Sequence, residues 1–216
     1  MKKLILTAIL IIPFVIVNAQ EIGELAPEKK PEVFPDNVLG LDIMFGEGGV
    51  GFGGFYRRQF DNNFTGFADF SISEIKEDNE FQYYDPYFGN PLPIAGKKNR
   101  VFLIPFNFGV QYRLFENLIS DNLRPYINAA FGPSMVVTTP YDREFFNAFG
   151  YARAKFTTGG YVGFGANFGL DKSSLLGINL RYYIVHFYDE GVESIEGRFR
   201  KNIGGFYLTI NLGLMY

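Results

Sequence analysis

Few residues in this sequence have the types and spacing that enzymatic chemistry requires. His186 is the only histidine, and the chain has no cysteine, which excludes a disulfide framework and a lipid-modified amino-terminal cysteine. The neighbours of His186, which are Val185, Phe187 and Tyr188, offer no serine nucleophile. No His, Cys and carboxylate cluster has metal-ligand spacing, and no phosphate-binding loop stands out. We therefore expect no catalytic residue, metal or cofactor; a lipid-modifying enzyme that uses His186 is the alternative.

A second group of polar residues recurs at alternate positions inside apolar segments. Because successive side chains of a strand point to opposite faces, these residues share one face of a sheet. A charge that faced lipid would cost about 2–4 kcal/mol at the midplane, so this face should line an interior. The group comprises Asp42, Arg57, Asp69, Asn107, Gln111, Arg113, Asn128, Asn167, Asn179, Arg181 and Asn211.

The same group has two functional interpretations. It could form a charged pore or gate, or it could fill the interior as a network of salt bridges and hydrogen bonds. A barrel of eight strands has an interior only just wide enough for side chains, so we favour the network. A narrow channel or transporter for small or hydrophobic solutes is the alternative function.

Aromatic and charged residues gather in two stretches without strand periodicity. They are candidates for a recognition surface, because tyrosine-rich loops can bind partners; packing of the loops on one another is the alternative. The candidates are Tyr83, Tyr84, Tyr87, Phe88, Tyr141, Arg143, Phe145 and Phe146.

The elements that must position these residues are eight strands, each with one apolar and one small or polar parity. The last segment is the clearest, with all its large apolar side chains on one parity: Phe206, Leu208, Ile210, Leu212, Leu214 and Tyr216. Three connections are short, near 61–63, 116–122 and 171–174, and three are long, near 74–99, 139–155 and 189–202. The first connection, near 47–49, is short and departs from this alternation. Pro133 predicts a β-bulge or a local break, because proline cannot donate to a ladder.

The volumes of the two parities decide which face lies inside. The apolar parity carries the bulky Phe, Leu and Ile side chains, whereas the other is rich in Gly, Ser and Asn. Only the small parity fits the interior of an eight-stranded barrel. The sequence therefore predicts an all-β protein, an eight-stranded antiparallel up-and-down transmembrane β-barrel with short periplasmic turns and longer extracellular loops. A soluble lipocalin-like barrel and a secreted β-sandwich are the alternatives.

The amino terminus predicts export. Lys2 and Lys3 precede an apolar run from Leu4 to Val17, and Val17-Asn18-Ala19 is a small-residue cleavage pattern. We expect a signal peptide over 1–19, a periplasmic leader over 20–37 and the barrel over 38–216. The chain has a net charge of −3, which argues against nucleic-acid binding.

Over 38–216 the chain resembles the small eight-stranded bacterial outer-membrane barrels of the A, X and W types, with the subfamily unresolved. Its last strand resembles the insertion signal that the barrel-assembly machinery reads. The resemblance implies an outer-membrane location in a Gram-negative-type bacterium, with outer-membrane lipids, lipopolysaccharide and that machinery as partners. We expect a non-enzymatic barrel with a polar lumen filled by side chains, whose surface loops mediate interaction with an unknown extracellular partner or support envelope integrity.

Overall fold

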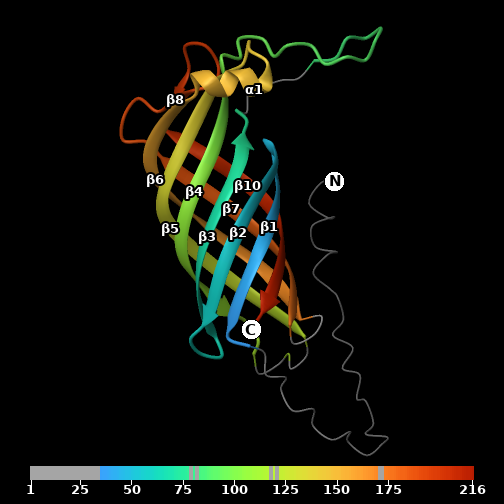
Figure 1. Ribbon diagram of the computed structural model, residues 1–216, viewed down its shortest axis with the longest axis vertical. Helices are drawn as coiled ribbons and strands as arrows, with labels where there is room; N and C mark the ends of the chain where they lie inside the picture. Colours follow the sequence, from blue (N-terminus) through green and yellow to red (C-terminus); the bar gives the residue numbers. More distant parts are fainter. Residues whose placement is uncertain (1–34, 78–79, 81–82, 117–118, 120–121, 170–172) are drawn as a thin grey trace, which may run out of the picture. The chain divides into compact units, whose positions relative to one another are not determined.

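The computed structural model describes residues 35–77, 80, 83–116, 119, 122–169 and 173–216; the predicted signal peptide and most of the predicted leader lie outside them. Eight long strands form a closed barrel in the order β1-β10-β7-β6-β5-β4-β3-β2 (Figure 1). Their bounds are β1 Asn37–Gly46, β2 Gly49–Gln59, β3 Phe64–Ile75, β4 Asn99–Arg113, β5 Leu123–Pro140, β6 Arg153–Gly169, β7 Ser174–His186 and β10 Asn202–Met215. A two-stranded sheet of β8 (Val192–Glu193) and β9 (Phe199–Arg200) lies between β7 and β10, and a short helix α1 (Phe145–Ala148) lies between β5 and β6. The predicted eight-stranded antiparallel barrel is confirmed.

Each strand pairs with its neighbours in the wall in an antiparallel ladder, so the barrel has the predicted up-and-down topology. The wall closes where β1 meets β10, with Leu39 opposite Leu214 and Ile43 opposite Ile210. Backbone hydrogen bonds between Asn37 and Tyr216 extend this seam to the last residue. We call the end of the barrel that carries Asn37 and Tyr216 the terminal end, and the opposite end the loop end.

Pro133 interrupts one ladder without shifting its register. Pairing of β4 with β5 stops between Pro105 opposite Ser134 and Phe108 opposite Phe131, and it resumes in the same register. The other ladder of β5 continues through Pro133, which lies opposite Thr158. The proline therefore causes a local break and no bulge.

The connections alternate in length as predicted. At the terminal end β2 and β3 are joined by a tight turn in which the Asp61 carboxylate accepts a hydrogen bond from the Asn62 backbone N–H at 2.7 Å. At the loop end the two long loops 76–98 and 141–152 and the segment 187–201 cover the barrel (Figure 1). The exception is the two-residue connection Glu47-Gly48 from β1 to β2. Gly49, the first residue of β2, follows it with a φ of 126°, which residues other than glycine rarely adopt.

Large apolar side chains cover the outer face of the wall. On β1, Leu39 is 57% and Leu41 is 66% exposed, whereas Asp42 and Met44, on the other parity, are buried. The same alternation holds on β10, where Phe206, Leu208, Leu212 and Leu214 are exposed and Thr209 and Asn211 are fully buried. The facing that side-chain volume predicted is therefore confirmed. No helix among the described residues is long and apolar enough to cross a membrane.

Candidate functional site

The middle of the lumen holds a fully buried group of opposite charges. Arg181 on β7 places one guanidinium nitrogen 2.9 Å from the Asp42 carboxylate of β1 and another 4.0 Å from the Asp69 carboxylate of β3. The side chains of all three are at most 3% exposed. An unpaired buried charge costs several kcal/mol. The closed wall avoids this cost by bringing these three residues, from three strands, close enough to pair.

Neutral donors complete the coordination of both carboxylates. Asn211 on β10 donates to Asp42, and Asn107 on β4 donates to Asp69 at 3.0 Å. Tyr161 on β6 also donates to Asp69. Donors from three further strands therefore converge on this group, which we call the central charge layer (Asp42, Asp69, Arg181 and their donors Asn107, Tyr161 and Asn211).

The other predicted lumen residues lie nearer the terminal end. The Arg57 guanidinium donates to Asn167 at 3.2 Å and lies 4.2 Å from the centre of the Phe55 ring. Asn128 and Asn179 are buried, and in the described part of the chain Asn128 Oδ1 and both polar side-chain atoms of Asn179 have no hydrogen-bond partner. Gln111 and Arg113 line a small cavity of about 40 Å³ at the mouth, together with Arg57 and Arg124. The structure thus places all the predicted lumen residues inside, but it joins only some of them into one network.

From the central charge layer toward the loop end the packing becomes largely apolar, although buried hydroxyls remain among it, such as that of Ser73, which donates to Tyr207 at 3.3 Å. Tyr183 and Tyr207 pack edge to face there, with ring centres 5.3 Å apart. Further toward the loop end, buried aliphatic and aromatic side chains fill the interior: Ile75, Val101, Leu103, Val136, Val185, Phe187, Val192 and Ile203. We call this group the apolar plug. Between them, the central charge layer and the apolar plug occupy the lumen with packed side chains.

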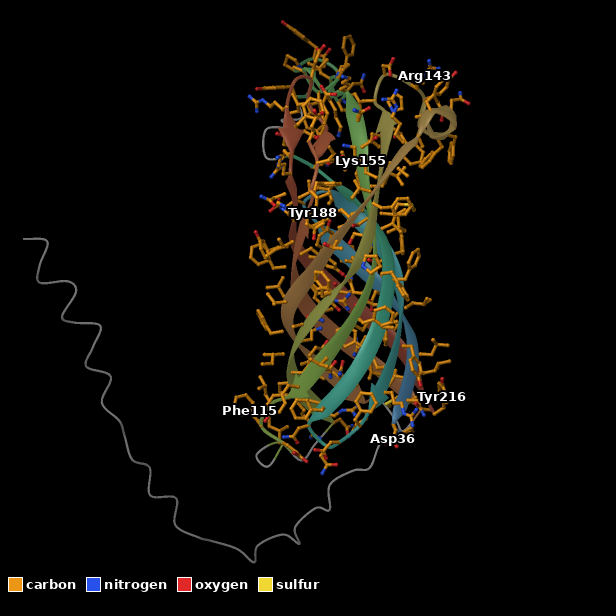
Figure 2. All side chains as sticks on the ribbon, turned by 90° about the vertical axis from the view of Figure 1, so that its left-hand side faces the viewer. Asp36, Phe115, Arg143, Lys155, Tyr188 and Tyr216 are labelled. Atoms are coloured by element: carbon orange, nitrogen blue, oxygen red, sulfur yellow. The ribbon has the colours of Figure 1, made fainter. Side chains whose placement is uncertain are left out.

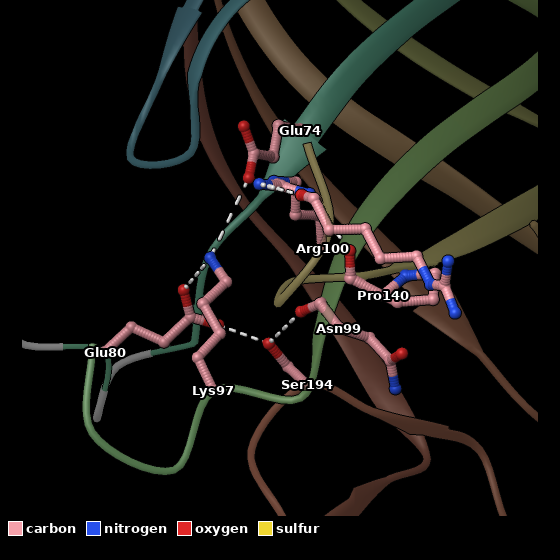
Figure 3. Close-up of polar contacts among 8 residues, drawn as sticks. Glu74, Glu80, Lys97, Asn99, Arg100, Pro140 and Ser194 are labelled. Atoms are coloured by element: carbon pink, nitrogen blue, oxygen red, sulfur yellow. Dashed lines mark hydrogen bonds and ion pairs between the residues drawn. The ribbon is translucent and has the colours of Figure 1, made fainter. Parts of the chain in front are cut away.

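A buried ion pair ties the loops over the apolar plug (Figure 3). Lys97 Nζ lies 2.6 Å from a Glu80 carboxylate oxygen, and the two side chains are 3% and 0% exposed. The hydroxyl of Ser194, from the segment after β7, donates to the other Glu80 oxygen. Backbone hydrogen bonds join the same segments, from the N–H of Lys98 to the Ser194 carbonyl at 2.7 Å and from the N–H of Glu196 to the Gly96 carbonyl at 2.9 Å. We call this group (Glu80, Lys97 and Ser194) the loop clasp.

The connection from β5 to β6 is fixed to the rim by aromatic and cationic contacts. Lys97 and Arg100 both contact the Tyr141 ring, with the cation centres 5.0 and 4.9 Å from the ring centre. Phe145 of α1 packs on Phe102, an outward residue of β4, with ring centres 6.2 Å apart. Tyr141 and Phe145, predicted as recognition residues, therefore hold the loop in place.

Between these loops a cleft of about 880 Å³ opens at the loop end. Four segments line it, 96–99, 138–143, 151–155 and 191–199. Figure 2 shows Arg143 and Lys155 at this end of the barrel, far from Phe115 and Tyr216. We call it the loop cleft.

Two further ion pairs lie at the edge of the loop cleft. Lys155 Nζ is 2.8 Å from Asp189, and Lys98 Nζ is 2.6 Å from Glu193. The hydrogen bond from Lys155, followed by that from the Gly191 N–H, lowers the pKa of Asp189. The hydrogen bond from Lys98 likewise lowers the pKa of Glu193.

The remaining predicted recognition residues are exposed and lie in two connections, 76–98 and 141–152. Tyr84 and Pro91 pair in a short hairpin whose turn is held by the Asp85 side chain, which accepts from the backbone N–H of Tyr87 at 2.8 Å. The exposed fractions there are 62–63% for Tyr83 and Tyr84, 90% for Tyr87 and 79% for Phe88. Phe146 is also 79% exposed. Arg143 lies over the Tyr151 ring in the loop cleft, with its guanidinium carbon 3.8 Å from the ring centre.

His186 lies exposed at the end of β7. Its Nδ1 is 2.6 Å from Asn202 Oδ1, and its ring packs edge to face on Tyr188. The hydroxyl of Thr157 donates to the His186 backbone carbonyl. The imidazole of His186 therefore does not position this hydroxyl. Within the described ranges no group of three or more His, Cys, Asp or Glu could hold a metal ion.

Sequence reasoning missed the loop clasp and most of the residues that line the loop cleft. Glu80, Lys97 and Ser194 lie in long connections without periodicity, so nothing in the sequence indicates that they meet. Tyr151 and Arg153 lie next to the predicted residues of the same loop, and an aromatic next to a basic residue is the signal that could have included them.

Comparisons with known proteins support the architecture. No family model matches the sequence, and no curated protein matches it. The structure is similar to the crystal structure of Neisserial surface protein A, with a TM-score of 0.53 and 11% identity over 86% of this chain and 100% of that one. Weaker similarities include the β-barrel domain of OprF from Pseudomonas aeruginosa (TM-score 0.45, 12% identity, 83% and 97% coverage). Another is the attachment invasion locus protein Ail of Yersinia pestis (TM-score 0.42, 11% identity, 82% and 95% coverage).

The likeness to Neisserial surface protein A extends over the whole length of that chain, and the eight described strands of this chain close into one wall. The chain therefore has the fold of the small eight-stranded outer-membrane β-barrels.

Proposed function

We propose that this protein is a non-enzymatic outer-membrane barrel, closed to solutes, which holds its loops as a rigid surface for an extracellular partner. The observation that carries the proposal is the filling of the lumen. The central charge layer and the apolar plug are both buried, and the loop clasp lies over them. Arg181 packed against two carboxylates, with apolar side chains stacked toward the loop end, supports a barrel that does not conduct solutes.

The apolar outer face supports the membrane location. A wall with apolar side chains outside and polar ones inside is stable only where lipid surrounds it. Tyr216, 64% exposed, and Phe115, 58% exposed, lie at the terminal end (Figure 2), where aromatic rings suit a membrane interface. This proposal includes a signal peptide over 1–19, a leader over 20–37 and an insertion signal in the last strand, with lipopolysaccharide and the barrel-assembly machinery as partners.

A planar-bilayer recording on the purified full chain tests whether the barrel is closed. We expect no conductance from the native protein. The double variant Leu103→Ala and Val136→Ala, which removes volume from the apolar plug, serves as a control for the sensitivity of the recording. Steady single-channel conductance of the native protein, in preparations that migrate as folded barrel on an unboiled gel, would contradict the proposal.

Membrane fractionation tests the location, and lipid analysis tests the enzymatic alternative. The protein should sediment with the outer membrane and shift its gel mobility on heating. Expression should leave lipid A unchanged. A modified lipid A that disappears with His186→Ala would replace this proposal by the lipid-modifying enzyme.

A further inference from the structure

The loop cleft has the composition of a saccharide site. Its volume of about 880 Å³ lies within the range of small-ligand pockets, roughly 300–1,000 Å³. Two aromatic side chains line it, Tyr151 at 56% and Phe199 at 55% exposure. A flat exposed ring can stack on the C–H face of a sugar ring while the sugar hydroxyls stay free to bond elsewhere.

Charged groups of both signs line the same cleft, and most of the cations are already paired. Lys98 and Lys155 have carboxylate partners at 2.6 and 2.8 Å, and Lys97 is held by the loop clasp. The groups that remain for a ligand are two guanidinium donors, Arg143 and Arg153, and two carboxylate acceptors, Asp142 and Glu196. All four are exposed and line the cleft, and within the described ranges none of them forms an ion pair.

Arg143 is already oriented for binding. Its guanidinium lies over the Tyr151 ring at 3.8 Å, which limits its rotamers before a ligand arrives. The loop that carries it is fixed at Arg100, whose guanidinium donates to the Pro140 carbonyl at 3.0 Å (Figure 3). The same guanidinium donates to the Arg143 carbonyl at 3.3 Å. The Glu144 side chain caps α1 by accepting from the backbone N–H groups of Phe146 and Asn147, at 3.2 and 3.0 Å. Ordering of this kind before binding reduces the entropy lost in the complex.

We infer that the loop cleft binds a short saccharide that carries an acidic substituent. The carboxylates of Asp142 and Glu196 accept hydrogen bonds from sugar hydroxyls, and the Tyr151 and Phe199 rings pack on sugar faces. The guanidinium groups of Arg143 and Arg153 bind the acidic group through charge-assisted hydrogen bonds. A linear acidic peptide would not need the two carboxylate acceptors, Asp142 and Glu196. Their presence therefore favours a ligand rich in hydroxyl groups. This inference rests on the proposed function, because it names the chemistry of the extracellular partner.

The chain itself allows a selective reporter. It contains no tryptophan, so Tyr151→Trp places a single indole in the cleft and keeps an aromatic ring under Arg143. All binding measurements use the full-length Tyr151→Trp protein in detergent as the parent. Its tryptophan emission is recorded as probes are added.

Three sugar probes and one peptide probe distinguish the outcomes. The sugars are 3′-sialyllactose as a soluble acidic trisaccharide, rough-type lipopolysaccharide as an acidic sugar of the same membrane, and maltotriose as a neutral trisaccharide. We expect a saturable change with an acidic probe and a weaker one with maltotriose. Sialyllactose alone would point to a soluble or foreign glycan, and lipopolysaccharide alone to the surrounding membrane. Response to neither acidic sugar, or to an oligoglutamate peptide instead, would overturn the inference.

Substitutions in the cleft test which groups bind. Arg153→Ala and Asp142→Ala should each weaken the acidic probe by about tenfold, the usual effect of one hydrogen bond to a charged group. The matched control is Arg198→Ala, an exposed arginine of the segment 187–201 that does not line the cleft; it should bind as the parent does. Equal affinity in all variants would refute the site.

Conductance separates this inference from the proposed function. A silent barrel that binds no sugar contradicts the saccharide site alone. A conducting barrel contradicts the proposed function, whatever the sugars do.

Discussion

Removal of the Arg181 side chain tests the central charge layer directly. Arg181→Met keeps the length and apolar character of the side-chain stem and deletes the guanidinium that lies 2.9 Å from Asp42 and 4.0 Å from Asp69. Both carboxylates then keep only neutral donors in a site where their side chains are at most 3% exposed. Removal of one partner from a buried ion pair typically costs 3–5 kcal/mol, and we expect a loss of about that size in the free energy of unfolding.

Urea unfolding from lipid vesicles, followed by the gel-mobility difference between folded and unfolded barrel, measures this loss. The triple variant Arg181→Met, Asp42→Asn and Asp69→Asn should recover most of it, because it leaves no buried charge. Arg198→Met, at an exposed site, controls for the change of residue type. If Arg181→Met unfolds at the native urea concentration, or if the triple variant is less stable than the single one, the charges do not form the network described above.

Three further predictions concern the wall and the segments at the loop end. Leu208→Arg, on the outer face of β10, should lose about 2–4 kcal/mol in the same vesicle assay, whereas Leu208→Met should lose little; equal losses would contradict the outward facing. Lys97→Met leaves the Glu80 carboxylate without its cation in a site where the Glu80 side chain is 0% exposed, and it should make the loop-end segments cleavable by added protease. Lys155→Met, which removes a lysine whose side chain is 39% exposed, should not. Indistinguishable digests would mean that the loop clasp does not hold the loops. The hydrogen bonds of Asp189, first of all that from Lys155, hold its pKa below the ordinary value of 3.8. The stability that this carboxylate contributes is therefore complete at neutral pH and is lost as pH falls through the lowered pKa. A carboxyl NMR titration should find the midpoint of Asp189 below 3.8 in the native protein and nearer 3.8 in Lys155→Met.

The wall was predictable because the period of a strand is two. Leu39, Leu41 and Ile43 alternate with small or polar residues, and only one parity fits a narrow interior. The interior polar residues follow from the same alternation, which is why the sequence alone places Asp42, Asp69 and Arg181 inside. Which of them touch depends on the tilt and stagger of strands far apart in sequence, and the alternation does not determine these.

The apolar plug was not predictable in the same way. Near the loop end of β4, the run Val101-Phe102-Leu103-Ile104 is apolar on both parities, so alternation says nothing there about facing. In the structure Val101 and Leu103 fill the lumen, while Phe102 is covered from outside by Phe145 and Phe149. A run that is apolar on both sides at a strand end thus marks a place where another part of the chain covers the wall.

The clasp and the cleft depend on side chains from separate loops. Glu80, Lys97 and Ser194 are brought together by loop paths that carry no periodic signal. The aromatic residues of the loops were noticed from composition, but composition did not distinguish Tyr141, which packs, from Tyr87, which is 90% exposed. Burial of a loop residue is decided by its neighbours in space.

The placement of Asp42, Asp69 and Arg181 on three different strands also bears on how the wall closes. If β1 joined β10 one residue out of step, Asp42 would be turned into the acyl chains and Leu41 would take its place beside Arg181. Such a misaligned seam would leave one charge in hydrocarbon and another without its counter-ion. The buried trio therefore favours the correct register of the seam, since only the correctly aligned cylinder lets all three charges pair.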